Sequence, residues 1–153
     1  MSDYFQGNFP LQSVSEIKNT LRGLEAETKE VSDNLALTVA EAALDRKADD
    51  ILVLRVADVS YLADYFVIMT GYSRVQVRAI AESIEAKVHT DWQRRPLRTE
   101  GKADSSWVLL DYGEVIVHIM MPTEREFYNL EAFWVHAERI SLAKSDEGGG
   151  KPK

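Results

Sequence analysis

The run YFVIMT at residues 65–70 is the part of the sequence that most constrains the fold. A strand with one face in water alternates apolar and polar side chains, and this run shows no such alternation. An apolar run of this length that ends at a glycine, here Gly71, is typical of a strand covered on both faces. The sequence therefore predicts a central strand with packed elements on both sides of its sheet.

The segments before this strand predict a helix and a neighbouring strand. Residues 35–47 place Leu37, Ala40 and Leu44 on one helical face. Residues 51–56 (ILVLRV) are rich in the branched side chains that favour strands. We expect both segments to pack with the central strand.

The segment after Gly71 predicts a second helix. Ser73 and Gln76 form the pattern of a capping box, and helical periodicity continues to about Val88. The side chains expected on its buried side are Val77, Ile80, Ala81, Ile84 and Val88.

The last third of the sequence predicts three strands and a helix. Residues 96–99 form a short strand, and the proline at its start suggests a sheet edge. Residues 106–121 form a hairpin that ends at Pro122, after which Thr123 and Glu126 give a second capping-box pattern. The helical segment that follows presents Phe127, Leu130, Trp134 and Ala137.

This order of elements predicts an α/β (α+β) fold, with a mixed sheet of about five strands and helices packed on it. Residues 35–143 form the folded domain. Residues 1–34 form an N-terminal extension, partly helical, because Val14, Ile17, Leu21 and Leu24 recur at helical spacing. Residues 144–153 are Gly-rich and charged, which predicts a disordered tail.

The composition excludes several classes of site. The chain has no cysteine, which rules out disulfides, thiol nucleophiles and thiolate metal sites. No apolar run is long enough for a membrane span, and the N-terminus lacks a signal-peptide pattern, so we expect a cytoplasmic protein without a membrane partner. The net charge is −7, and residues 35–143 hold 17 acidic and 12 basic residues. We therefore expect little direct contact with nucleic acid.

The turn at residues 70–73 is the candidate nucleotide site. A strand that leads into a helix can present backbone amides to a phosphate. This turn lacks the glycines and the lysine of known phosphate-binding loops. A nucleotidyltransferase also needs paired carboxylates for Mg²⁺, and residues 96–99 offer none. A capped helix start is the favoured interpretation, and a nucleotide-binding enzyme is the alternative.

Asp111 and Glu114 are the candidate acid–base pair, on either side of the Tyr112–Gly113 turn. Turn chemistry explains them more simply, because aspartate accepts backbone hydrogen bonds and glycine supplies a positive φ. We predict no catalytic residue here.

The histidines predict no metal site, since they are far apart and lack paired-ligand spacing. Alternation in the second hairpin strand groups His118 with Ile116 and Met120, opposite Val115, Val117 and Ile119. His118 is either a hydrogen-bonded structural residue or part of an interface.

The hairpin and the helix after it carry a set of aromatic residues that suits a protein-docking surface. Each of these residues alone would be expected in a core. Their clustering around a few polar groups favours a surface that binds another protein. The aromatic residues are Trp107, Tyr112, Tyr128 and Trp134.

Several ordered motifs resemble the ribosomal silencing factor (RsfS, or Iojap) family over roughly residues 35–135. They are KADDILVLRV, ADYFVIMTGYS, RAIA, PLRTEG, WVLLDYGEVIVHIM and REFYNLEAFW. Residues 1–34 and the Gly-rich tail have no counterpart in the shared core of the family, and Tyr72 is bulkier than expected in its turn.

The resemblance implies a translation repressor without enzymatic activity or cofactor. Such a protein would bind the large ribosomal subunit through its ribosomal protein number fourteen, block joining of the small subunit, and form a homodimer. It also implies a fold similar to nucleotidyltransferases without their catalytic carboxylates. An assembly factor for the large subunit is the alternative that the same contact would serve.

The resemblance also implies the residues of the binding surface. Trp107 would be the aromatic anchor, Asp111 a charged acceptor for a basic partner residue, and Gly113 a point of close approach. The full set is Trp107, Asp111, Tyr112, Gly113, His118 and Tyr128.

Overall fold

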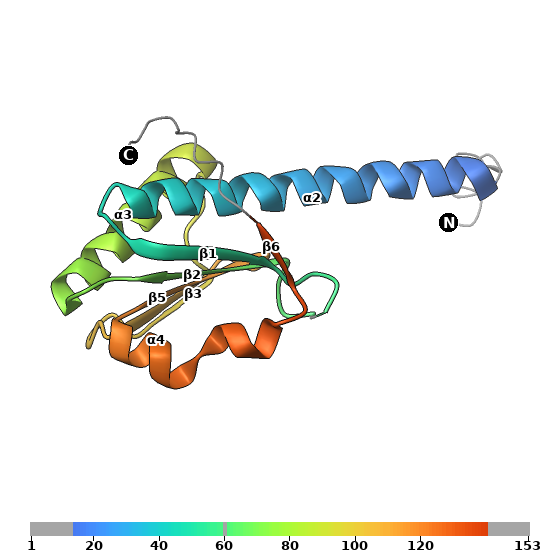
Figure 1. Cartoon of the computed structure of the whole chain (residues 1–153). Helices are drawn as coiled ribbons and strands as arrows, with labels where there is room; N and C mark the ends of the chain where they lie inside the picture. Colours follow the sequence, from blue (N-terminus) through green and yellow to red (C-terminus); the bar gives the residue numbers. More distant parts are fainter. Residues whose placement is uncertain (1–13, 60, 141–153) are drawn as a thin grey trace, which may run out of the picture. The chain divides into compact units, whose positions relative to one another are not determined.

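Strand β2 (Tyr65–Thr70) lies inside a six-stranded sheet, and all six of its residues are buried. The computed structural model describes residues 14–59 and 61–140. The sheet has the order β3-β4-β5-β2-β1-β6 (Figure 1). The other strands are β1 (Asp49–Arg55), β3 (Arg98–Glu100), β4 (Trp107–Asp111), β5 (Val115–Met120) and β6 (Glu138–Ile140). The predicted central strand and α/β class are confirmed.

The pairing of β2 with β5 determines the topology. These two strands run parallel in register from Tyr65 opposite Val115 to Thr70 opposite Met120, whereas the other neighbours are antiparallel. Parallel strands need a long crossover connection. Here the crossover contains helix α3 (Arg74–Trp92) and strands β3 and β4.

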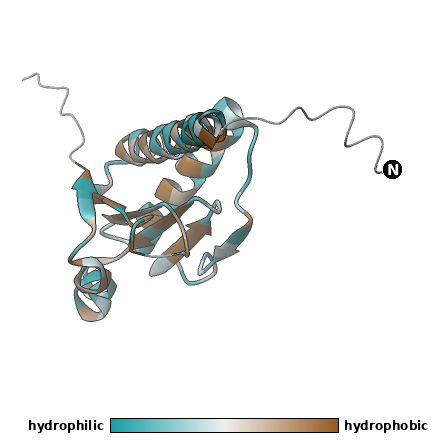
Figure 2. Ribbon diagram, turned by 90° about the vertical axis from the view of Figure 1, so that its right-hand side faces the viewer, coloured by the Kyte–Doolittle hydropathy of each residue, from teal (hydrophilic) through white to brown (hydrophobic). Residues whose placement is uncertain are grey.

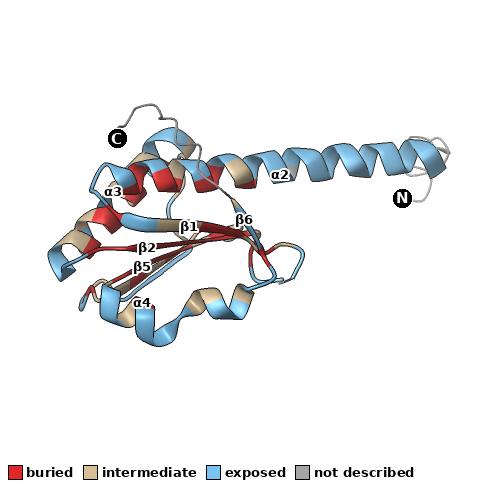
Figure 3. Cartoon of the chain, viewed as in Figure 1, coloured by how far each residue is buried: buried red, intermediate tan, exposed pale blue. Residues whose placement is uncertain are grey.

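Two apolar layers cover the two faces of the sheet. One face packs against α3 and the later part of α2. The apolar layer between them includes Val67 and Val117 from the sheet and Ile80 from α3. The other face packs Phe66 and Met120 under α4 (Pro122–Tyr128) and the short helix η1 (Leu130–Trp134). Figure 3 shows buried residues along the strands, on α3 and on the later part of α2, and Figure 2 shows that much of the sheet is apolar. Packing on both faces accounts for the unbroken apolar run of β2.

Helix α3 follows the prediction closely. Its buried residues are the five expected ones, and the Ser73 side chain accepts a hydrogen bond from the Gln76 amide at 3.0 Å. The Gln76 side chain accepts from the Tyr72 amide at 2.7 Å rather than from Ser73. The helix continues past Val88 to Trp92, where Gln93 in a left-handed conformation caps it.

The buried face of the first helix differs from the prediction. Helix α2 (Val14–Leu44) crosses the boundary after Val31 that divides the chain into two units. Of the three residues predicted to share one helical face, Ala40 is buried, whereas Leu37 and Leu44 are exposed. The residues that pack in the core are instead Leu35, Ala36, Val39, Ala42 and Ala43. Alanine lets the helix backbone lie close to its neighbours, so the small residues mark the buried face.

The C-terminal elements also differ from the prediction. Helix α4 begins at Pro122 with Met121 as its cap, so the Thr123–Glu126 capping box was wrong. A left-handed Asn129 separates α4 from η1, where one helical segment was expected. Strand β6 is an additional sixth strand. The expected tail at residues 144–153 lies outside the described residues.

Gly101 gives a stability test of the β3–β4 connection. It has a φ of +88°, and an added Cβ would lie 2.0 Å from the Trp107 carbonyl oxygen. Because this contact is with backbone, Gly101→Ala should lower the free energy of unfolding by at least about 3 kcal/mol.

Gly113→Ala is the matched control for this substitution. Gly113 also has a positive φ, +98°, but the nearest atom is a Leu97 methyl group at 3.4 Å. Gly113→Ala should lower the free energy of unfolding by about 1 kcal/mol, from backbone strain alone. If urea unfolding showed the same loss of unfolding free energy for both variants, the close approach of Gly101 to the Trp107 carbonyl would be contradicted.

Candidate functional site

Six aromatic rings form a continuous series of contacts on the α4 side of the sheet, and we call this series the aromatic row. Successive ring centroids lie 4.8–5.9 Å apart, within the range of favourable aromatic contacts. In order, the rings belong to Phe127, Tyr128, Trp107, His118, Phe66 and Trp134.

Strand alternation places the centre of the row on one face. On β4, Trp107, Leu109 and Asp111 are partly exposed, whereas the residues between them are buried. Leu109 lies opposite His118 on β5. The sheet face that carries Trp107 and His118 is therefore the face under α4, as the predicted alternation of β5 required.

Trp107 is held in place by His118. The indole Nε1–H of Trp107 donates to Nδ1 of His118 at 3.1 Å. Burial lowers the pKa of His118 to about 4, so the imidazole is neutral at physiological pH. Because Nδ1 accepts, the proton of the neutral ring is on Nε2. His118 is thus a hydrogen-bonded structural residue that orients Trp107.

The row changes from buried to exposed along its length. Phe66 and His118 are buried and Trp107 is partly exposed, whereas Tyr128 is 47% and Phe127 77% exposed. Exposed aromatic rings beside a buried, rigid base resemble the anchor residues of protein interfaces. The exposed end, formed by Phe127, Tyr128 and Trp107, is the candidate binding surface.

Asp111 and Gly113 lie in the turn at the far end of β4, roughly 13 Å along the strand from Trp107. The Gly113 amide donates to Asp111 at 2.8 Å, and Gly113 has a positive φ. The Arg98 guanidinium lies 3.7 Å from the same carboxylate. The predicted turn chemistry is confirmed.

Glu114 has an internal partner as well. Arg94 binds both of its carboxylate oxygens at 2.8 Å and donates to the Tyr112 carbonyl at 2.6 Å. The hydrogen bonds from Arg94 lower the pKa of Glu114. This geometry suits a structural ion pair that fixes the turn.

Tyr112 does not belong to an exposed surface, which corrects the sequence-based assignment. Its side chain is fully buried in the core under α3, and burial raises the pKa of the phenol. Alternation explains the difference, because Tyr112 follows Val108 and Leu110 on the face opposite to Trp107.

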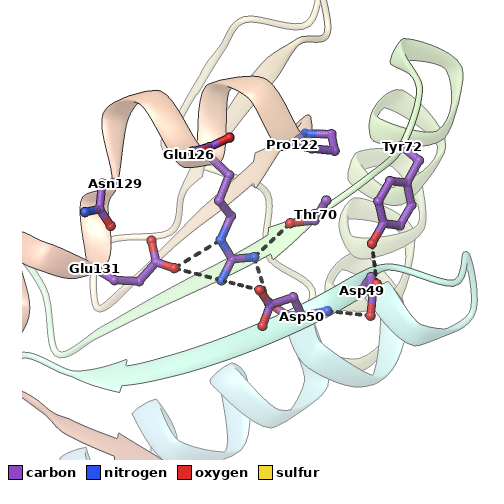
Figure 4. A pocket seen from close by; sticks show the side chains of 9 residues that line it. Asp49, Asp50, Thr70, Tyr72, Pro122, Glu126, Asn129 and Glu131 are labelled. Atoms are coloured by element: carbon purple, nitrogen blue, oxygen red, sulfur yellow. Dashed lines mark hydrogen bonds and ion pairs between the residues drawn. The ribbon is translucent and has the colours of Figure 1, made fainter.

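A hollow of about 690 Å³ lies at the ends of β2 and β5, beside the turn at residues 70–73 (Figure 4). At its base is the buried Arg125, which donates to the Asp50 carbonyl at 2.7 Å and to Thr70 Oγ1 at 2.9 Å. It also donates to Glu131 from two nitrogens, at 3.1 and 3.2 Å. Arg125 therefore joins α4 and η1 to the sheet.

The electrostatics of this hollow oppose phosphate binding. Its walls carry four carboxylates, and Arg125 already uses its donors within the protein. The four acidic residues are Asp49, Asp50, Glu126 and Glu131. Within residues 14–59 and 61–140, no group of three acidic, histidine or cysteine side chains is arranged to hold a metal ion. None of the described helices could cross a bilayer.

Comparison with known proteins establishes the family. The model described as "Ribosomal silencing factor during starvation" matches residues 28–152. The chain belongs to this family. Over 107 residues it is 41% identical to ribosomal silencing factor RsfS of Bacillus subtilis, covering 69% of this chain and 90% of that protein. The names of the family and of this relative describe a silencing factor rather than an enzyme.

Other members of the ribosomal silencing factor family differ in length. The chloroplastic protein Iojap of Arabidopsis thaliana is 34% identical over 129 residues, covering 81% of this chain and 53% of that protein. The chain spans about half the length of the plant relatives it matches. A mouse relative, 34% identical over 89 residues (57% of this chain, 39% of that protein), is named mitochondrial assembly of ribosomal large subunit protein 1.

A solved structure supports the fold assignment. A crystal structure of a Chromobacterium violaceum protein matches with a TM-score of 0.65 at 32% identity. The match covers 72% of this chain and 91% of that one. The α/β fold predicted from the sequence is thus shared with a solved structure.

Three features of the site were missed from the sequence. Phe127 was placed on the last helical segment and Phe66 in the central strand, and neither was included in the binding surface. Arg125 was overlooked because a lone arginine on a helix is usually solvated. The signal for Arg125 was its place in the motif REFYNLEAFW, beside the aromatic residues.

His118 predicts a specific pH dependence of stability. The unfolded chain binds a proton at this residue below its ordinary pKa of 6.5, whereas the folded chain binds it only near pH 4. The free energy of unfolding therefore falls as the pH drops through this window. Between pH 7 and pH 5, wild type should lose about 2 kcal/mol more than His118→Gln. If urea titrations showed the same loss of unfolding free energy for both proteins between pH 7 and pH 5, His118 would not be buried as a neutral imidazole.

Proposed function

We propose that this protein represses translation by binding the large ribosomal subunit, through its ribosomal protein number fourteen, and blocking the small subunit from joining. The exposed end of the aromatic row would be the contact. The observation that carries the proposal is the pairing of exposed Phe127 and Tyr128 with a Trp107 whose orientation is fixed by buried His118.

The charge around this surface favours a protein partner over RNA. Aromatic rings can stack on unpaired bases, but such sites also carry basic residues along the nucleic-acid backbone. Helix α4 instead carries Glu124 and Glu126, and its one basic residue, Arg125, is buried and bonded. With a net charge of −7, the chain is suited to a basic protein on the ribosome surface.

Membership of the family supports the ribosome as the target, since the matching model is described as a ribosomal silencing factor. The name of the mouse relative favours a second candidate function, assembly of the large subunit. Both functions would use the same surface. They differ in whether the protein acts on mature subunits.

Sedimentation of purified, mature subunits tests the proposal. Wild type should travel with the large subunit and reduce the fraction of joined ribosomes after remixing. The variant Phe127→Glu/Tyr128→Glu should bind at least about thirtyfold more weakly, because it places charge at two anchor positions without changing the core. Val75→Glu is the matched control, since Val75 is an exposed apolar residue on α3, on the other side of the sheet.

The outcomes separate the alternatives. Binding without any loss of joined ribosomes would favour the assembly role over repression. Equal binding by the double variant and the control would remove the exposed end of the aromatic row as the contact. A wild-type protein that stays at the top of the gradient would contradict both functions.

A further inference from the structure

The N-terminal part of helix α2 carries an exposed apolar seam. Its large side chains are between 41% and 67% exposed. The pattern, with spacings of three and four residues alternating, is that of a coiled coil rather than of a helix packed on a globular core. We call this seam, on residues 14–31, the arm seam. Its positions are Val14, Ile17, Leu21, Leu24, Thr28 and Val31.

The arm seam ends where the folded unit begins. The next position in the pattern is Leu35, which is fully buried in the core of residues 32–153. Residues 14–31 therefore present about 27 Å of helix whose apolar positions repeat every 3.5 residues. A repeat of this kind matches the surface of a second helix with the same repeat.

We propose that the arm seam binds the arm seam of a second copy of this chain, in antiparallel orientation. In this alignment Val14 lies against Val31 of the second copy, and Leu21 against Leu24. Ile17 lies at the level of position 28 of the second copy. The contact is symmetric about an axis between Leu21 and Leu24, so each pair occurs twice, and apolar residues occupy almost the whole seam.

Charge complementarity supports this partner and this orientation. The antiparallel alignment places Lys18 beside Glu25 of the second copy, on both sides of the axis, at positions that flank the seam. A parallel alignment would instead pair Thr20 with Glu25 and Glu27 with Ser32, which gives no ion pair. The second copy therefore supplies both the apolar seam and the opposite charges.

The first test is sedimentation equilibrium of the full chain over a series of micromolar concentrations. Wild type should show a reversible monomer–dimer equilibrium. Leu21→Glu should weaken the dimer on the order of a hundredfold or more, because it places a charge in each half of the seam. Ala26→Glu, an exposed residue of the same helix away from the seam, should leave the dimer unchanged. Both variants introduce a good helix former at an exposed site, so the fold should be retained.

The second test addresses the orientation. Lys18→Glu and Glu25→Lys should each weaken the dimer, and the two substitutions together should restore it. Because the chain has no cysteine, a mixture of Lys18→Cys and Glu25→Cys chains should form disulfide-linked pairs between the two variants. A parallel dimer would give neither the restoration nor the mixed link.

Three results would overturn the proposal. A wild-type chain that stays monomeric at every concentration would show that something else, such as another segment of the chain, covers the arm seam. A dimer that survives Leu21→Glu would show that copies associate through the folded unit. A dimer without rescue by the charge exchange would reject the antiparallel pairing. None of these results depends on ribosome binding, so the proposed function is tested separately.

Discussion

The parallel pairing of β2 with β5 is the constraint on which the rest of the folded unit depends. It places an apolar strand inside the sheet and requires a crossover connection between the two strands. The crossover brings α3 to one face and leaves the other face to α4 and η1. Because β5 leads directly into α4 at Pro122, the same pairing sets where the exposed aromatic residues of α4 lie.

The candidate surface is built from its buried side outward. Phe66 and His118 are held in the core, His118 accepts the indole hydrogen of Trp107, and Trp107 contacts Tyr128. Arg125 fixes the helix that carries Tyr128 by bonding to Asp50 and Thr70 in the sheet. A contact made through these rings would therefore cost little conformational freedom, which is the advantage of a preorganised surface.

The sequence predicts what depends on local patterns. It correctly assigned four such features: the apolar run of β2, the cap at Ser73, the alternation of β5 and the turn at Gly113.

The sequence misleads where tertiary packing determines which side chains are buried. Alanines rather than Leu37 and Leu44 face the core, because close helix packing favours small residues. Tyr112 and Trp107 were grouped together, although strand geometry sends them to opposite faces of the sheet. The motif around Arg125 does not show what this arginine binds, since Asp50 and Thr70 are far away in the sequence.

Hydrogen–deuterium exchange on the protein bound to the large ribosomal subunit tests the proposed contact surface directly. We expect added protection in β4 and α4, around Trp107 and Tyr128, with the amides of α3 unchanged between free and bound protein. Protection centred on α3, or confined to the hollow at Arg125, would show that a different surface makes the contact.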